Sequence, residues 1–196
     1  MTERDIHALR AEALATLAEA TPAANEALDV ESALRNLTAA TQAVLGDKGA
    51  HLRPGGLRAG EHQFTDAGIF LITPDRPYNL LVAEHGFPPE QHRLRIPIDL
   101  GHPGQVVQHQ RPLVLANTDE SPDFRQILKT ARMGSAVFGP LFWRGQMLGQ
   151  IITAAQARYT YSATDLDILM GFVHVAATVY IAHGGQSGSA PSCDRA

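Results

Sequence analysis

The chain has 196 residues, enough for one domain with extensions at its ends. Hydrophobic residues make up 44% and charged residues 18%, which is typical of a globular protein. The formal net charge is -4 and no basic block occurs, so the composition argues against a nucleic-acid partner and against a polybasic membrane anchor. No apolar leader opens the sequence and no run is long enough to cross a bilayer, so we expect a cytoplasmic protein.

Two helices are expected at the start of the chain. Residues 3–20 repeat apolar side chains at helical spacing, and Pro22 is expected to end this first helix. A second helix is expected to follow Asp29, which suits its N-cap, and to stop at Gly46. Residues 1–28 are therefore assigned to an N-terminal helix that precedes the main domain.

The rest of the chain alternates between strand and helix patterns. In chain order we expect strands over 66–73, 78–86 and 93–98, a helix over 101–110, a strand over 112–117, a helix over 121–132, strands over 135–143 and 146–156, and a last helix from 162 to about 184. Closely spaced strands require hairpins, so the sheet is expected to be mostly antiparallel, with helices covering one face in an α+β arrangement. Residues 184–196 are expected to form a disordered tail.

The last helix carries two apolar faces, whereas a helix that only covers a sheet needs one. The second face consists of Ile168, Phe172, Val175 and Val179. It is expected to pack either on the two N-terminal helices of the same chain or on a second subunit. Of these alternatives we favour a homodimer with these four residues at its interface.

Several pieces of the chain, taken in order, resemble the GAF domain family over roughly residues 29–183. They are Gly68-Ile69-Phe70-Leu71-Ile72, the turn Gly101-His102-Pro103-Gly104, the strand from Arg111 to Asn117, and the closing hairpin from Ser135 to Leu141 and from Leu148 to Ile151. The resemblance implies a central antiparallel sheet of about six strands, with a helical layer on one face and a pocket under the connecting loops on the other. Family members bind cyclic nucleotides, tetrapyrroles, small anions or other metabolites there, and some serve only as dimerisation elements.

The sequence argues against the covalent chemistry that this family offers. The only cysteine is Cys193 in the tail, so no thiol in the domain can attach a bilin. Free methionine sulfoxide reductases resemble this chain around Arg95–Pro97, but they need a thiolate nucleophile and a resolving thiol. Leu94, Pro103 and Gln126 mark the regions where those thiols are expected, and none is present. No serine-hydrolase elbow or phosphate-binding loop occurs either, so we expect no catalytic residue and no enzyme activity. No metal is expected, because the histidines form no His-x-His or His-x-x-x-His pair.

Ligand contacts are expected from the loops between residues 87 and 134 and from the adjoining strands. Arginines there suit a carboxylate, phosphate or nitrate, although they can equally be surface charges paired with nearby acids. The turn that holds His102 either offers backbone N–H groups to an anion or is simply a tight turn that needs a glycine. The predicted ligand-binding residues are Phe70, Arg95, His102, Asn117, Phe124, Arg132, Ser135 and Phe138.

The sequence disfavours one ligand known for this family and leaves another open. Cyclic-nucleotide binding is not favoured, because Thr118 follows Asn117 where that pattern has lysine. No cofactor is expected, but haem stays open because axial ligation needs only one histidine.

We therefore expect a non-catalytic sensor that binds a small polar or anionic molecule. Because the chain shows no second domain to receive a signal, the recipient is expected to be another protein, such as a histidine kinase or a transcription regulator. The alternative is a ligand-free dimerisation or scaffold module.

Overall fold

The structure is a computed structural model, and it describes residues 3–122, 124–126 and 132–185. The helices are α1 (Glu3–Glu26), α2 (Val30–Val44), α3 (Gly101–His109) and α4 (Ala163–Ala182), with short 3-10 turns at η1 (Ala50–Leu52), η2 (Pro89–Gln91) and η3 (Thr118–Glu120). The strands are β1 (Thr65–Ile72), β2 (Tyr78–His85), β3 (Arg95–Pro97), β4 (Leu113–Leu115), β5 (Ser135–Trp143) and β6 (Gln146–Ala155). They form one antiparallel sheet in the order β3-β2-β1-β6-β5-β4.

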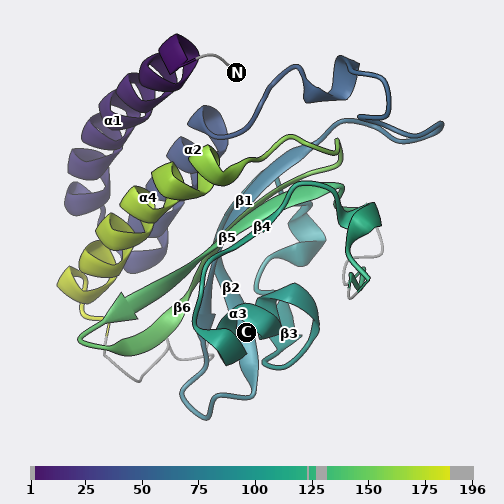
Figure 1. The fold of residues 1–196 in the computed structure, drawn as a ribbon. Helices are drawn as coiled ribbons and strands as arrows, with labels where there is room; N and C mark the ends of the chain where they lie inside the picture. Colours follow the sequence, from purple (N-terminus) through teal and green to yellow (C-terminus); the bar gives the residue numbers. More distant parts are fainter. Residues whose placement is uncertain (1–2, 123, 127–131, 186–196) are drawn as a thin grey trace.

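Both faces of the sheet are covered, and β1 shows how the sequence allows this. Side chains alternate between the faces of a strand. Ile69 and Leu71 of β1 pack in the core under the helices, whereas Phe70 and Ile72 pack in a second core on the opposite face. Figure 1 shows α1, α2 and α4 together on one side of the sheet and α3 on the other. The predicted α+β arrangement, with a helical layer on one face and connecting loops on the other, is confirmed.

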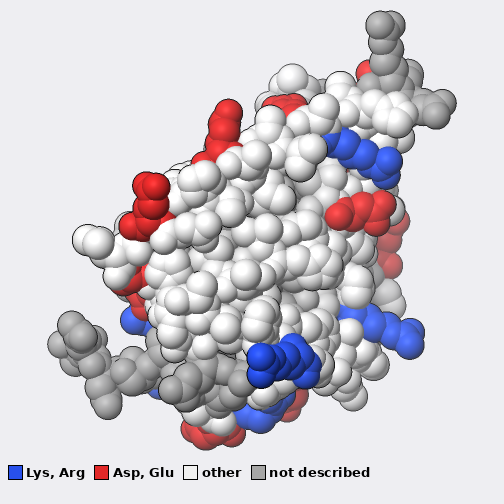
Figure 2. Space-filling view, turned by 90° about the vertical axis from the view of Figure 1, so that its left-hand side faces the viewer, with Lys and Arg blue, Asp and Glu red and all other residues white. Residues whose placement is uncertain are grey.

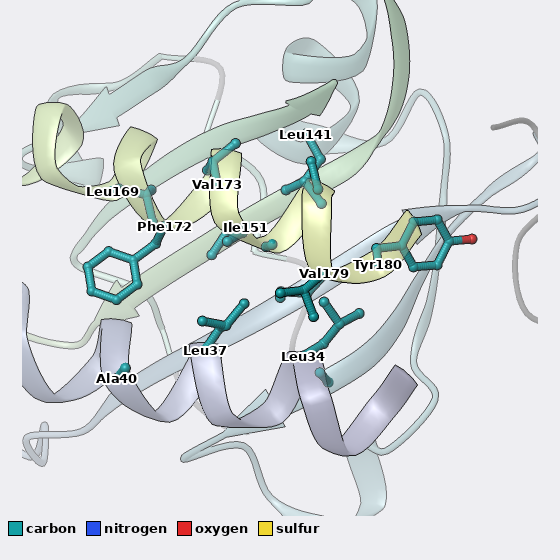
Figure 3. Close-up of a cluster of buried hydrophobic side chains, with 14 of the residues drawn as sticks. Leu34, Leu37, Ala40, Leu141, Ile151, Leu169, Phe172, Val173, Val179 and Tyr180 are labelled. Carbon is teal, nitrogen blue, oxygen red and sulfur yellow. The ribbon is translucent and has the colours of Figure 1, made fainter. Parts of the chain in front are cut away.

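Helices α2 and α4 pack side by side on the sheet, and α1 packs on both of them from outside. The close approach of α4 to β5 depends on Gly139, since a Cβ there would come within 2.6 Å of a methyl carbon of Val173. Figure 3 shows Phe172 and Val179 pointing toward α2, where Leu34 and Leu37 lie. Phe172 and Val179 of the second apolar face are thus covered by helices of the same chain, the alternative that the sequence left open beside a dimer, whereas Ile168 and Val175 are partly buried. Among the described helices, α4 alone is long and apolar enough to span a bilayer, and its position in this core accounts for that composition.

Local signals placed the caps and the tightest turn correctly. Asp29 caps α2 by accepting a hydrogen bond from the N–H of Ser32 at 2.8 Å. Ser162 and Asp165 form a capping box at the start of α4. Arg144 and Gly145 both take positive φ, at 48° and 80°, as a two-residue hairpin turn between β5 and β6 requires.

Two expectations about helices are wrong. Helix α1 does not end at Pro22 but continues through it to Glu26. Packing outweighs the local break here, because Ala24 lies fully buried in the core while Pro22 stays exposed.

The second wrong expectation is the helix over 121–132. The described part, 121–122 and 124–126, is not helical, whereas residue 123 and residues 127–131 lie outside the described residues. The N–H of Phe124 bonds to the carbonyl of Ser121, which makes a single turn, and Phe124 then faces the cavity described below. The predicted tail over 184–196 also lies outside the described residues beyond Gly185.

Candidate functional site

A cavity of about 270 Å³ lies on the face of the sheet opposite α1, α2 and α4. Its floor comes from β1, β5 and β6, and its walls come from the segment after β2, from β3, from the start of α3 and from the loop before β5. Its lining is mostly apolar. The described lining residues are Phe64, Asp66, Phe70, Gly86, Phe87, Pro88, Gln91, Leu94, Ile96, His102, Pro103, Phe124, Arg125, Gln126, Met133, Phe138, Ile152 and Ala154.

Four of the eight predicted ligand-binding residues line this cavity, namely Phe70, His102, Phe124 and Phe138. The imidazole of His102 lies between two of the phenyl rings, with ring centroids 5.8 Å from Phe124 and 6.3 Å from Phe138. Phe70 of β1 and Phe138 of β5 both lie on the cavity face of the sheet, because along each strand they alternate with residues that face the helices.

The turn at the start of α3 places His102 in the cavity wall. Gly101 has a φ of 60°, and a Cβ on Gly104 would come within 2.4 Å of the backbone of Asp99. The structure therefore confirms the tight-turn interpretation of this motif. His102 is 3% exposed; its Nδ1 lies 2.9 Å from Oε1 of Gln105, and its Nε2 has no hydrogen-bond partner among the described residues.

Asp66 is the lining residue that sequence reasoning missed. It lies in β1, on the same face as Phe70, and is only 6% exposed. The N–H of Ala154 bonds to its carboxyl group, but its Oδ1 has no partner in the described part of the chain. Burial raises the pKa of Asp66 to about 7, although the bond from Ala154 opposes this. The only sequence signal was an acidic residue in a strand that is otherwise apolar.

The other predicted ligand-binding residues lie outside the lining. Arg95 is exposed on the edge strand β3. Asn117 caps η3 and donates from its amide to Glu120 and Tyr159. Ser135 is buried, where it donates to the carbonyl of Leu115 and accepts from the N–H of Tyr161.

Arg132, the last of the eight, touches the cavity only through one of its walls. Its guanidinium carbon lies 5.0 Å from the centre of the Phe124 ring, and Nη2 donates to Oδ1 of Asp119 at 2.8 Å. Nη2 is therefore engaged with the protein, whereas the buried Nε has no hydrogen-bond partner among the described residues.

Behind this wall lies a buried arginine that the sequence did not single out. The side chain of Arg158 is 2% exposed, and its guanidinium pairs with both carboxylate oxygens of Glu61 and, through Nε, with Asp119 at 2.8 Å. Arg58 and Arg132 complete the set around Asp119. These five residues, here called the Arg158 network, join the loop before β1 to η3 and to the segment between β6 and α4.

The Arg158 network keeps its two acids ionised. The hydrogen bonds that Arg158 donates to Glu61 lower the pKa of this carboxyl group, although burial opposes the shift. Burial alone would raise the pKa of Asp119, but the hydrogen bond and charge of Arg158, together with Arg132 and Arg58, outweigh it and lower that pKa. The network is thus a structural ion-pair cluster, with Arg132 as its contact to the cavity.

The histidines do not gather around an ion. His102 lines the cavity, whereas His85, His92 and His109 are exposed. Within the residues that the structure describes, no three side chains of His, Cys, Asp or Glu come together as a metal site would require.

Comparison with known proteins shows that other proteins share this architecture. Three solved structures share the fold. The GAF domain of a phosphoenolpyruvate-protein phosphotransferase from Acinetobacter has a TM-score of 0.67 at 15% identity, over 92% of this chain and 95% of that one. A free methionine-R-sulfoxide reductase from Neisseria meningitidis, in complex with its substrate, has a TM-score of 0.70 at 17% identity, over 94% of both chains. A candidate GAF sensor protein from Burkholderia vietnamiensis has a TM-score of 0.68 at 18% identity, over 89% and 98%.

These identities show a shared fold and carry no activity with them. No curated protein shows significant sequence similarity to the chain. The family model described as GAF domain matches residues 57–179, which is more than half of the sequence and includes the whole sheet and most of α4. The chain belongs to the GAF domain family.

Proposed function

We propose that this chain is a non-catalytic sensor domain that binds a small molecule in the cavity and relays binding to a partner protein, such as a histidine kinase or a transcription regulator. The observation that carries the proposal is a cavity of about 270 Å³ that holds Oδ1 of Asp66 and Nε2 of His102, two buried polar atoms without partners among the described residues. A buried polar atom without a hydrogen bond costs free energy. A ligand that supplies the missing hydrogen bonds would remove that cost, so these two atoms favour the binding of a ligand in the cavity.

The fold also offers a short path from the cavity to the helices. A single layer of sheet separates the two, because Phe70 on the cavity face of β1 is followed by Leu71 on the helix face. A ligand that moves β1 or β6 would therefore press directly on α2 and α4. GAF domains are generally regulatory domains, and this geometry supports a regulatory role here.

The non-catalytic part of the proposal rests on the residues available. No cysteine occurs between residues 1 and 192, so the cavity of this chain contains no thiol for the chemistry of the sulfoxide reductases that share its fold. Turnover of free methionine sulfoxide by the pure chain, supplied with dithiothreitol, would contradict this part of the proposal.

Thermal unfolding against a panel of anions, amines, amino acids, nucleotides and cyclic nucleotides tests ligand binding. A true ligand at a hundredfold excess over its Kd should add about 2.7 kcal/mol to the free energy of unfolding and raise the melting temperature. The variant Ala154→Leu, which fills part of the cavity, should abolish the shift. Ala18→Leu, on the exposed side of α1, is the matched control and should keep it. Silence across the whole panel would overturn the sensor proposal.

The alternative of a dimerisation module is favoured by a separate observation. Figure 2 shows a broad, mostly uncharged surface on the side of the molecule where α1 lies. Leu14 of α1 is 69% exposed, and Ile168 and Val175 of α4 are only partly buried. Phe172 and Val179 are buried inside the chain, so a homodimer on this side would rest on the first three residues.

A further inference from the structure

We infer that the cavity binds an organic amine, a compact and largely apolar molecule whose protonated amino group donates hydrogen bonds to Asp66 and His102. This inference rests on the proposed sensor function and specifies the ligand class of the same cavity. It differs from the anion that the arginine-rich loops suggest in the sequence.

The two atoms of the cavity named above, which have no partner among the described residues, are both hydrogen-bond acceptors. A carboxylate oxygen such as Oδ1 of Asp66 accepts when ionised. Because Oε1 of Gln105 is an acceptor, Nδ1 of His102 carries the ring proton, and Nε2 of the neutral ring is left as an acceptor too. Two acceptors in one apolar cavity call for a ligand that donates, and an ammonium group has three donors.

The aromatic lining points the same way. Five phenylalanines line the cavity: Phe64, Phe70, Phe87, Phe124 and Phe138. The faces of phenyl rings attract cations, most strongly where water is excluded. A buried carboxylate among such rings is a favourable place for a protonated amine and an unfavourable one for an anion.

The described lining offers little to balance a negative ligand. Its one basic side chain is Arg125, which is exposed, while Arg95 and Arg132 lie outside the lining. An amino acid would bring its carboxylate together with its amine, so a simple amine fits these groups better. The volume of about 270 Å³ is near the lower end of the roughly 300–1,000 Å³ range of ligand pockets, which restricts the ligand to a small molecule.

Isothermal titration calorimetry with three probes of similar size tests the charge preference in the full chain. The probes are phenethylamine, 2-phenylethanol and phenylacetate, which share the ring and differ in the polar end. We expect phenethylamine to bind at least about tenfold more tightly than either of the others, as a charge-assisted hydrogen bond in a buried site predicts. This selectivity is measured on the unmodified protein, so it does not depend on the folding of any variant.

Asp66→Asn then identifies the group responsible. The variant keeps the shape of the side chain but removes its charge, so it should lose the tenfold preference for the amine and retain its affinity for the alcohol. Asp75→Asn, in the exposed turn between β1 and β2, is the matched control and should bind like the unmodified protein.

The possible failures are distinct. Phenylacetate binding as tightly as phenethylamine, or an amine preference that survives Asp66→Asn, would overturn the amine inference and leave the sensor proposal standing. Stabilisation by anions or nucleotides with no response to any amine would do the same. Silence of all three probes and of the whole panel would overturn both proposals.

Discussion

Asp66 is a carboxyl group placed where ionisation is costly. It lies in the middle strands of the sheet, with the rings of the cavity on one side and an apolar core beyond β1 on the other. The ionisable groups described in this region include His102 and Arg125, which line the same cavity, and Tyr161, whose pKa is raised by burial and also by the charge of Asp66. Proteins keep such a group at the expense of stability where it serves a ligand.

The raised pKa of Asp66 predicts a specific dependence of stability on pH. Between the ordinary value of 3.8 and about 7, the folded protein holds a proton that the unfolded chain has released. Stability should therefore fall as pH rises through this window and level off above it, by about 3 kcal/mol between pH 5 and pH 8. Urea unfolding at a series of pH values measures this fall.

Asp66→Asn provides the comparison for this pH series. The amide does not titrate, so the variant should lack this fall and should be the more stable protein at pH 8. Equal slopes for both proteins would contradict the assignment of the fall to Asp66. Asp75→Asn should follow the unmodified protein.

At the scale of elements, the Arg158 network holds together segments that the sheet does not connect. Glu61 belongs to the loop before β1, Asp119 to η3, and Arg158 to the segment between β6 and α4. Because Arg132 of the same network stacks on Phe124, one wall of the cavity is fixed to these segments. The network therefore sets the position of the wall as well as the stability of the loops.

Removing the central arginine should be costly. Arg158→Met should lower the free energy of unfolding by about 3 kcal/mol, since it leaves the partly buried carboxylate of Glu61 without its arginine and removes one of the three arginines around Asp119. It should also weaken the loss of stability at acid pH, because the depressed pKa values of Glu61 and Asp119 depend on Arg158. Urea unfolding at pH 4 and pH 7 measures both effects.

The control for this variant is Arg111→Ala, which removes an exposed arginine and should change stability by less than about 0.5 kcal/mol. A loss of similar size in both variants would contradict a special role for the network.

At the scale of the whole molecule, the helical layer buries its apolar side chains against the sheet and leaves others exposed on its outer side. Among the residues of α1 whose burial is described, only Ala13 and Ala24 are buried, while Leu14 is exposed. A second copy that packs on this side would bury the exposed apolar side chains of α1 and α4.

This gives a prediction for the state of the protein in solution. The unmodified chain should be a dimer by light scattering, and Leu14→Glu should make it a monomer, because a charge would be buried in the interface. Leu52→Glu, which changes an equally exposed leucine on η1, should leave the dimer intact. A monomer at high concentration for the unmodified chain would contradict the dimer and leave the cavity as the basis of function.

How much of this was predictable depends on the range of the interactions involved. Hairpins, caps and the turn at Gly101 were correctly predicted, because each depends on residues a few positions apart. Phe70, Phe124 and Phe138 were predicted as cavity residues through the family resemblance, whereas Phe64 and Phe87 were not. Ile168, Phe172, Val175 and Val179 were recognised as a second apolar face, yet the sequence did not say whether that face meets the same chain or another.

The sequence by itself thus determined the order of the elements, the antiparallel pairing and the general place of the cavity. Only the tertiary structure decided which polar groups belong to the cavity and which belong to the scaffold. Arg158 pairs with acids that are 39 and 97 positions away in the sequence, and no pattern near Arg158 predicts these pairs. Among the described residues, Oδ1 of Asp66 has no partner whereas Nη2 of Arg132 has one, and the reason is the same: burial and pairing are set by distant segments, so no local pattern encodes them.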